Sequence, residues 1–289
     1  MVKIVVDSSC DLPDKLIEEY DIKVLPQRIY LRDMEYYDKV TIQAEEVYEA
    51  MNNGIIPMTS LPSPAAILDL FYQCCREGND FIFVSISSKF SGTYHLAASL
   101  LEEVREQYKE SRMEVVDSKS ASTAAGLIAL QAAKLSRAGK DFDVILKQIC
   151  EMAEHVEHIF MVADLSWLIR GGRITRTEGV VGSMLNVLPV LHVKDGAVEQ
   201  LERVRGRKKA LLTILKVMED RIGDFPDQTI GISHGGNLEM AYELKDMIKQ
   251  RFGNDKIMIN KIGAVLISHL GIGGVGIFFF NRKPDMYME

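Results

Sequence analysis

The sequence predicts an α/β fold in two parts, a parallel βαβ sheet in residues 1–155 and a mixed α/β domain in residues 156–289. The first observation is an alternation of short apolar runs with amphipathic helical patterns in the N-terminal half. The second is a change of pattern after about His155, where a basic, glycine-containing segment precedes further strand-like runs. The third is the length of 289 residues, which suits one large domain or two ordinary ones.

The individual elements follow from these patterns in order along the chain. Buried strands are predicted at residues 4–6, 81–86, 113–116, 159–163, 230–232 and 276–280. Amphipathic helices are predicted from about Pro64, after Gly92, and over residues 120–137 and 142–155. Because strands alternate with helices, the N-terminal strands are expected to form a parallel sheet covered on both faces.

The second half predicts a mixed arrangement of strands and helices. A strand is expected at residues 189–193, followed by a turn at residues 194–196 and a further strand. A helix over residues 208–221 and a strand–helix unit around His234 come next. Residues 282–289 are expected to form an unpacked end.

Charge and composition exclude several classes of function. The net charge of -7 argues against general nucleic-acid binding, which needs a basic surface. Residues 165–209 nevertheless carry nine Lys and Arg against four Asp and Glu, which gives this stretch +5 and the remainder -12. No stretch approaches the roughly 20 apolar residues of a membrane span. The four cysteines form no C-x-x-C pair, and the pattern favours a reducing cytoplasm.

Small hydroxyl residues recur where the predicted N-terminal strands end. They occur in Asp7-Ser8-Ser9, in residues 85–88 and in residues 117–120. The carboxyl ends of parallel strands form the edge at which ligands bind in open α/β sheets. The alternative is that these residues only cap the helices that follow.

One motif suggests a serine hydrolase. Gly231-Ile232-Ser233-His234-Gly235 fits the G-x-S-x-G nucleophile elbow, with His269 downstream and Asp246 or Asp255 as the intervening acid. Only 56 residues follow Ser233, however, which leaves little room for the strands that carry the acid and histidine. A helix cap on a strand–helix turn explains the same letters, so a hydrolase is the alternative and not the leading hypothesis.

A second motif, Gly271-Ile272-Gly273-Gly274-Val275-Gly276, matches G-x-G-x-x-G but lies in the wrong context. A dinucleotide fingerprint follows a strand and opens a helix, whereas this one precedes a strand near the end of the chain. The glycines are instead expected to permit a tight turn and close backbone approach. No Walker A motif occurs and the six histidines form no metal-ligand pattern, so neither a metal nor a nucleotide cofactor is predicted.

Two hydroxyl segments remain as a predicted anion site. Thr59-Ser60-Leu61-Pro62-Ser63 lies before the helix predicted at Pro64, and Ser91-Gly92-Thr93 opens the next one. Backbone N–H groups at helix starts, together with hydroxyl donors, suit an anion. Neutral donors also avoid the cost of burying a full countercharge beside an apolar ligand. Thr59 and Ser91 are therefore candidate carboxylate ligands, with plain helix capping as the alternative.

Seven fragments in order along the whole chain resemble the DegV family of bacterial fatty-acid-binding proteins. These fragments are Val5–Ser9, Thr59–Ser63, Ser91–Thr93, Val116–Ser118, Leu168–Ile174, Val204–Ala210 and the pair Ser268–Gly271 with Gly273–Gly276. The resemblance implies two domains with one acyl chain buried between them. It also implies that a threonine matching Thr59 and a serine matching Ser91 hold the carboxylate, with a histidine matching His269 nearby.

The resemblance further implies a non-catalytic carrier. Family members of this kind present a long-chain fatty acid to a separate ATP-using fatty acid kinase subunit, and the acyl phosphate then feeds phospholipid synthesis. Arg173 and Arg205 match arginines that serve the acyl phosphate or the partner surface, and Arg170 is a weaker candidate for the same role. A third hypothesis is a lipid sensor that contacts another protein through the basic stretch. The length and saturation of the acyl chain stay open.

Overall fold

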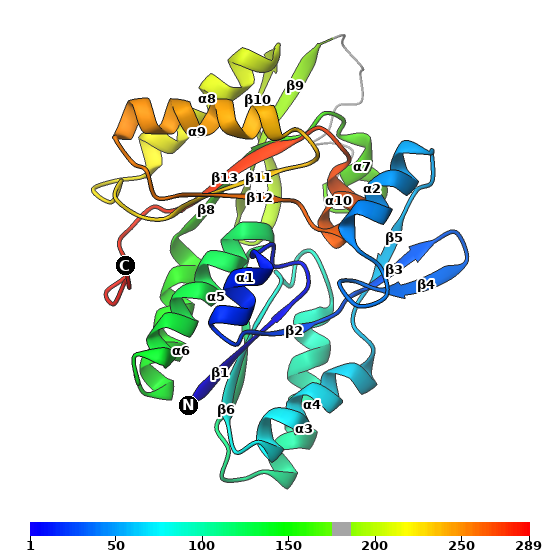
Figure 1. The fold of residues 1–289 in the computed structure, drawn as a ribbon, viewed down its shortest axis with the longest axis vertical. Coiled ribbons are helices and arrows are strands. Elements are labelled where there is room, and N and C mark those ends of the chain that lie inside the picture. Colours follow the sequence, from blue (N-terminus) through cyan, green and yellow to red (C-terminus); the bar gives the residue numbers. More distant parts are fainter. Residues whose placement is uncertain (175–185) are drawn as a thin grey trace.

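The computed structural model describes residues 1–174 and 186–289, and it contains three sheets (Figure 1). A four-stranded sheet has the order β2-β1-β6-β7, and a six-stranded sheet has the order β10-β9-β8-β13-β11-β12. A small three-stranded sheet, β4-β3-β5, lies to one side of them. The α/β class predicted from the sequence is therefore confirmed.

The four-stranded sheet is entirely parallel, as expected from the alternation of strands and helices. Its strands are β1 (Val2–Asp7), β2 (Lys23–Leu25), β6 (Asp80–Ser85) and β7 (Met113–Asp117). Successive side chains point to opposite faces, so Val5 packs with α3 and α4 while Ile4 and Val6 pack with α5 and α6. The helices around this sheet are α1 (Asp14–Glu19), α3 (Pro64–Arg76), α4 (Thr93–Gln107), α5 (Ser122–Arg137) and α6 (Phe142–His155).

The three-stranded antiparallel sheet was not predicted. It consists of β3 (Arg28–Leu31), β4 (Met34–Tyr37) and β5 (Met58–Ser60), with α2 (Ala44–Asn52) between β4 and β5. Thr59 lies inside β5, opposite Ile29 of β3. Its expected position at a helix start is therefore wrong. The N-cap of α3 is Ser63, whose hydroxyl accepts a hydrogen bond from the Ala66 N–H at 3.1 Å.

The six-stranded sheet is mixed, with one parallel pair, β11–β12, and antiparallel neighbours elsewhere. Its strands are β8 (Val156–Met161), β9 (Val187–Lys194), β10 (Ala197–Arg205), β11 (Ile230–His234), β12 (Ile257–Lys261) and β13 (Val275–Phe280). Two helices, α8 (Arg207–Arg221) and α9 (Leu238–Phe252), pack on one face of this sheet. The short helices α7 (Ser166–Gly171) and α10 (Ala264–Leu270) lie at the other side, near the three-stranded sheet.

Helix α5 lies between the two large sheets. It contacts β1 and β6 on one side and β8, β11 and β13 on the other, and most of its side chains are buried. A helix that is apolar all round is one that is covered on all sides. The predicted division after residue 155 falls at the junction of α6 and β8, and we keep it as our proposal for the domain boundary.

The C-terminal residues pack against α5, so the expected unpacked end is wrong. The Gln131 side chain accepts a hydrogen bond from the Met288 N–H at 2.8 Å and donates one to the Met288 carbonyl at 2.9 Å. The ring of Tyr287 packs edge-on against Phe225. Met286, Tyr287 and Met288 are partly buried against the core cluster that includes α5, and this burial of apolar surface explains why the tail is held.

Candidate functional site

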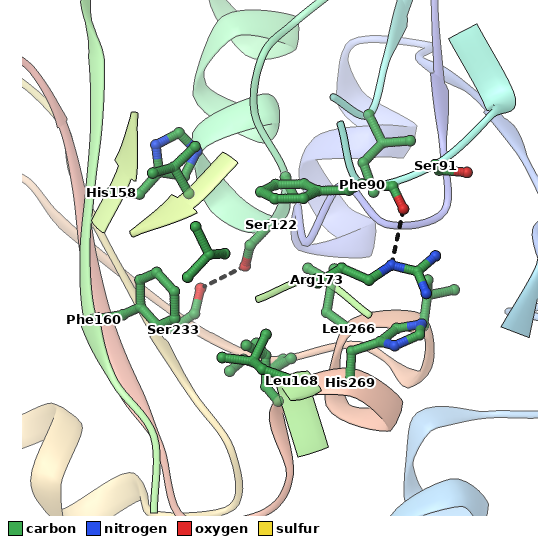
Figure 2. A pocket seen from close by; sticks show the side chains of 18 of the residues that line it. Phe90, Ser91, Ser122, His158, Phe160, Leu168, Arg173, Ser233, Leu266 and His269 are labelled. Carbon is green, nitrogen blue, oxygen red and sulfur yellow. Dashed lines mark hydrogen bonds between the residues drawn. The ribbon is translucent and has the colours of Figure 1, made fainter. Parts of the chain in front are cut away.

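A cavity of about 410 Å³ lies where the six-stranded sheet, the loops that follow β6 and β7, and the three-stranded sheet meet. Its volume is within the range of roughly 300–1,000 Å³ that small-molecule sites occupy. The wall is mostly apolar and includes Phe90, Phe160, Leu168, Val198 and Leu266. Residues from both predicted domains contribute to it, as the close-up view shows (Figure 2).

Thr59 and His269 meet at one end of this cavity. The Thr59 Oγ1 atom is 2.7 Å from the His269 Nε2 atom, and both residues line the cavity. Burial, and then the positive charge of Arg173, lower the pKa of His269 to about 4. The imidazole is therefore neutral at pH 7. A side chain at Gly171 would collide with the His269 ring, so a glycine is needed there.

Ser91 lines the same cavity and lies directly before α4, as predicted. Its hydroxyl is 2.8 Å from the Thr93 hydroxyl and accepts a weaker hydrogen bond, at 3.3 Å, from the Thr93 N–H. The Ser91 N–H donates to the Ser87 carbonyl at 3.1 Å, which holds the loop against the end of β6. The N-cap of α4 is Gly92, which also lines the cavity.

Arg173 reaches into the cavity wall from the segment after α7. Its Nε atom donates to the Phe90 carbonyl at 2.9 Å, and its guanidinium also donates to the Gly171 carbonyl. These bonds tie the two sides of the cavity together at this end. Burial lowers the pKa of Arg173, but the guanidinium remains a cation at neutral pH because the ordinary pKa of arginine lies far above that range.

The structure brings Thr59, Ser91, His269 and Arg173 to one cavity and leaves Arg170 and Arg205 outside it. Arg170 is exposed and its guanidinium lies 4.8 Å from the centre of the Trp167 ring. Arg205 is exposed at the end of β10. The stretch of residues 165–209 that carries the net charge of +5 also includes Arg176 and Glu178, which lie outside the described residues.

The floor of the cavity is the six-stranded sheet, and glycines of the G-x-G-x-x-G segment shape it. In register across the sheet, Ser233 of β11 faces Gly276 of β13, which in turn faces Phe160 of β8. A side chain at Gly276 would come within 2.7 Å of the Phe160 Cβ atom. At Gly274 it would come within 2.7 Å of the Met161 carbonyl oxygen. Glycine at these two positions therefore permits the close approach of the neighbouring strand, as expected.

The geometry does not support the hydrolase alternative. Ser233 lies within β11 and not on a strand-to-helix turn, because α9 begins only after the N-cap Asn237. The Ser233 hydroxyl is 2.6 Å from the Thr123 hydroxyl, whereas His269 is bonded to Thr59. Among the described residues, Ser233 has no histidine or carboxylate hydrogen-bond partner to activate it.

The hydroxyl loops at the strand ends play different parts. Asp7 accepts hydrogen bonds from the Ile86 N–H at 2.7 Å and from the Gln27 side chain at 2.9 Å, so its carboxylate braces neighbouring loops. Asp117 likewise accepts from the Ser88 N–H at 3.1 Å. Of the three predicted loops, the one after β6 supplies cavity residues. Asp7 and Asp117, in the other two loops, accept hydrogen bonds from backbone N–H groups of that loop.

A buried carboxylate that the sequence did not single out joins the two halves of the chain near the cavity. Asp11 accepts a hydrogen bond from the Ser122 hydroxyl at 2.6 Å and another from the Gly263 N–H at 2.9 Å. The Asn260 side chain donates to the Asp11 carbonyl at 2.7 Å. Burial raises the pKa of Asp11 to about 7, despite the two hydrogen bonds that favour its ionised form.

We predict that Asp11→Asn stabilises the protein at pH 8 by on the order of 2 kcal/mol and has little effect at pH 4. The folded state holds the Asp11 proton up to about pH 7, whereas the unfolded chain loses it near pH 4. Stability of the native sequence therefore falls as pH rises between these values, and asparagine avoids that loss. Its carbonyl oxygen keeps the hydrogen bond from the Gly263 N–H, and its NH2 group donates to the Ser122 oxygen in place of the bond that Asp11 accepts. Urea unfolding at the two pH values checks this; an equal difference at both would contradict it.

Neither a metal centre nor a membrane span is found in the described parts of the chain. Within residues 1–174 and 186–289, no group of three or more His, Cys, Asp or Glu side chains could hold a metal ion. Over the same ranges, no helix is long and apolar enough to cross a bilayer.

Comparisons with known proteins agree with this architecture. The family model described as an uncharacterised protein of the DegV family matches residues 1–282. A DegV domain-containing protein of Clostridium perfringens is 33% identical over 285 residues, which cover 98% of each chain. A second one, from Caldanaerobacter subterraneus, is 31% identical over 97% of this chain and 99% of its own.

Solved structures with the same fold carry fatty-acid-binding descriptions. A fatty-acid-binding DegV family protein from Thermus thermophilus is 30% identical, with a TM-score of 0.87 over 96% of this chain and 99% of that one. DegV of Bacillus subtilis, described as a fatty acid binding protein, is 28% identical, with a TM-score of 0.83 over 96% and 99% of the two chains. By sequence over nearly its whole length and by fold, this chain belongs to the DegV family.

Proposed function

We propose that this protein binds one long-chain fatty acid, with the acyl chain in the apolar part of the cavity and the carboxylate at the end formed by Thr59, Ser91, Arg173 and His269. The observation that carries the proposal is the distribution of polar groups: Thr59 is bonded to His269, Arg173 is bonded to the loop that carries Ser91, and all four residues line a cavity whose wall is mostly apolar. An amphiphile with one anionic head matches that distribution. Relatives of the same fold, such as the Thermus thermophilus protein, are described as binding fatty acids.

The apolar wall is expected to supply most of the affinity. Each methylene transferred from water is worth about 0.8 kcal/mol, so a C16 chain gains on the order of 10 kcal/mol before the costs of binding. The head-group residues then fix the direction in which the chain enters. A ligand without a charged head would lose that orientation but keep most of the apolar gain.

The head-group end suits a carboxylate for electrostatic reasons. Arg173 supplies one positive charge, while the neutral imidazole of His269 and the hydroxyls of Thr59 and Ser91 supply hydrogen bonds without further charge. The pair of Arg173 and one carboxylate is close to neutral, and Lys89, which also lines the cavity, is exposed to solvent. A buried site of this kind avoids the large penalty of an unpaired charge.

We further propose that the chain is not itself an enzyme and presents the bound acid to a separate ATP-dependent fatty acid kinase subunit in the cytoplasm. In that reaction a carboxylate oxygen attacks the γ-phosphorus of ATP, ADP leaves, and an acyl phosphate forms for phospholipid synthesis. The exposed guanidinium groups of Arg170 and Arg205 are available to an anionic partner surface or to the phosphate. Both lie outside the cavity, where they would not compete for the carboxylate.

Displacement of a fluorescent fatty-acid analogue tests the binding proposal. Hexadecanoic acid is expected to compete at least about tenfold more strongly than methyl hexadecanoate, because the ester loses the hydrogen bonds and ion pair of the carboxylate but keeps the chain. Failure of both compounds to displace the analogue would overturn the proposal. Equal competition by acid and ester would overturn the assignment of the head-group end.

The kinase proposal needs a separate assay. The purified chain, a candidate kinase subunit and ATP are combined with hexadecanoic acid, and acyl phosphate is trapped with hydroxylamine as the hydroxamate. Hydroxamate is expected only when all four components are present. Its formation without the kinase subunit would show that the chain is catalytic.

A further inference from the structure

A second set of polar side chains lines the cavity on the side opposite the head-group end. Figure 2 shows His158, Ser122 and Ser233 on one side of the cavity and Arg173 with His269 on the other. The carboxylate proposal uses none of these three residues. They lie on the side of the cavity along which the acyl chain would run, in a wall that is mostly apolar.

His158 is buried with both of its ring nitrogens unsatisfied. His158 is 3% exposed, and neither its Nδ1 nor its Nε2 atom has a hydrogen-bond partner among the described residues. The ring packs edge-on against Phe278, its neighbour across the sheet, with 5.7 Å between the ring centres. A buried donor and acceptor without partners is unfavourable, and few such groups occur in native proteins.

The position of His158 on β8 explains why its ring reaches the cavity. Alternate residues of a strand share a face, and Phe160, two positions along, also lines the cavity. Burial, and then the neighbouring His192, lower the pKa of His158 to about 3. The ring is therefore neutral, so one nitrogen donates a hydrogen bond and the other accepts one.

Two serine hydroxyls line the same side of the cavity. The Ser122 and Ser233 oxygens are 3.4 Å apart, and both residues line the cavity. Ser122 donates its proton to Asp11, which leaves its oxygen as an acceptor. Its backbone has a φ of 55°, a conformation rare for residues other than glycine, which shows that the surrounding structure holds it in place.

We propose that His158 recognises a hydroxyl group on the acyl chain, with Ser122 and Ser233 as further polar groups on the same side of the cavity, so that hydroxy fatty acids are a preferred ligand class of this protein. The inference rests on the proposed function, because the hydroxylated chain must occupy the same cavity as a simple fatty acid. A hydroxyl both donates and accepts, which matches a neutral imidazole. A second carboxylate does not match, since His158 is neutral, Ser122 and Ser233 carry no charge, and Lys89, the other cation that lines the cavity, is exposed to solvent.

The test measures competition between chains of equal length. Hexadecanoic acid competes separately with each of a series of hydroxyhexadecanoic acids that carry the hydroxyl at different carbons, on delipidated protein, by native mass spectrometry. At least one isomer is expected to bind about tenfold more tightly than hexadecanoic acid, the gain of one well-made hydrogen bond in a buried site. Hexadecanedioic acid, with a second carboxylate, is expected to bind less well than hexadecanoic acid.

Two variants link any preference to these residues. His158→Phe keeps an aromatic ring against Phe278 but removes both nitrogens, and it should reduce the preference to parity or below. Ser233→Ala is a smaller change that should lower the preference severalfold, and it serves if the first variant does not fold. No isomer exceeding hexadecanoic acid, or a preference unchanged in both variants, would overturn this proposal. Failure of every acid to bind would instead overturn the proposed function.

Discussion

Replacement of both Thr59 and Ser91 by alanine is expected to weaken the binding of hexadecanoic acid about 100-fold while the protein stays folded. Each hydroxyl is expected to donate to the carboxylate, and a hydrogen bond to a charged group contributes about 1.5–3 kcal/mol. The two contributions are not fully additive, because both act on one small anion. Titration calorimetry measures the affinity, and urea unfolding measures the stability of the same samples.

Ser63→Ala is the matched control for this double variant. Ser63 caps α3 close to Thr59 in the sequence but does not line the cavity. Loss of its cap should cost about 1 kcal/mol of stability and leave the affinity for the acid unchanged. An unchanged affinity in the Thr59→Ala and Ser91→Ala double variant would show that the carboxylate lies elsewhere.

Removal of the cation at the head-group end is the second large effect. Arg173→Ala should weaken acid binding on the order of 50-fold, a value below that of a fully buried ion pair because Arg173 is only half-buried. Affinity for methyl hexadecanoate should change much less. The pKa of His269, lowered first by burial and then by Arg173, should also rise, which a titration of its ring signals by NMR would detect.

Two further arginine variants separate charge from position. Arg173→Lys keeps the positive charge but loses the planar fork that bonds the Phe90 and Gly171 carbonyls, so an intermediate loss is expected. Arg170→Ala removes an exposed cation only three residues away and should leave acid affinity unchanged. Equal losses in the Arg170→Ala and Arg173→Ala proteins would indicate a general charge effect and contradict a specific contact.

Most strands of the two large sheets were predictable because they are short apolar runs with clear ends, but β2 and β12 were not predicted. Residues 81–86 and 276–280 are almost uninterrupted apolar sequences, and short runs of that kind are typical of strands covered on both faces. The three-stranded sheet lacks this signal. Strand β4 (Met34–Tyr37) is half exposed and β5 has three residues, so neither produces a period that stands out from loop sequence.

The candidate site was predictable only in part, because some of its residues lie in elements that have no clear pattern in the sequence. Ser91 was placed correctly before a helix because Gly92 and the following amphipathic pattern mark that helix start. Thr59 was assigned to the right segment but the wrong element, since Pro64 marks the start of α3 and says nothing of a strand five residues earlier. The contact between Thr59 and His269 joins residues 210 positions apart and has no local signature.

Residues whose role depends on burial were the hardest to predict. Arg173 lies in a stretch rich in exposed cations, and its sequence does not reveal that it alone of the candidate arginines lines the cavity. His158 precedes an apolar run and reads as a strand boundary, yet it is buried. Asp11 follows a strand end like many capping residues, and only the fold brings Ser122 and Gly263 to its carboxylate.

The central claim is that the cavity holds one fatty acid per chain, and the most direct measurement is mass spectrometry of the ligand released by denaturing protein purified from a bacterial host. The account predicts roughly one long-chain acid of about 14 to 18 carbons per chain, and much less from the Thr59→Ala and Ser91→Ala double variant. Protein that releases no fatty acid, and takes up none when hexadecanoic acid is added, would contradict it.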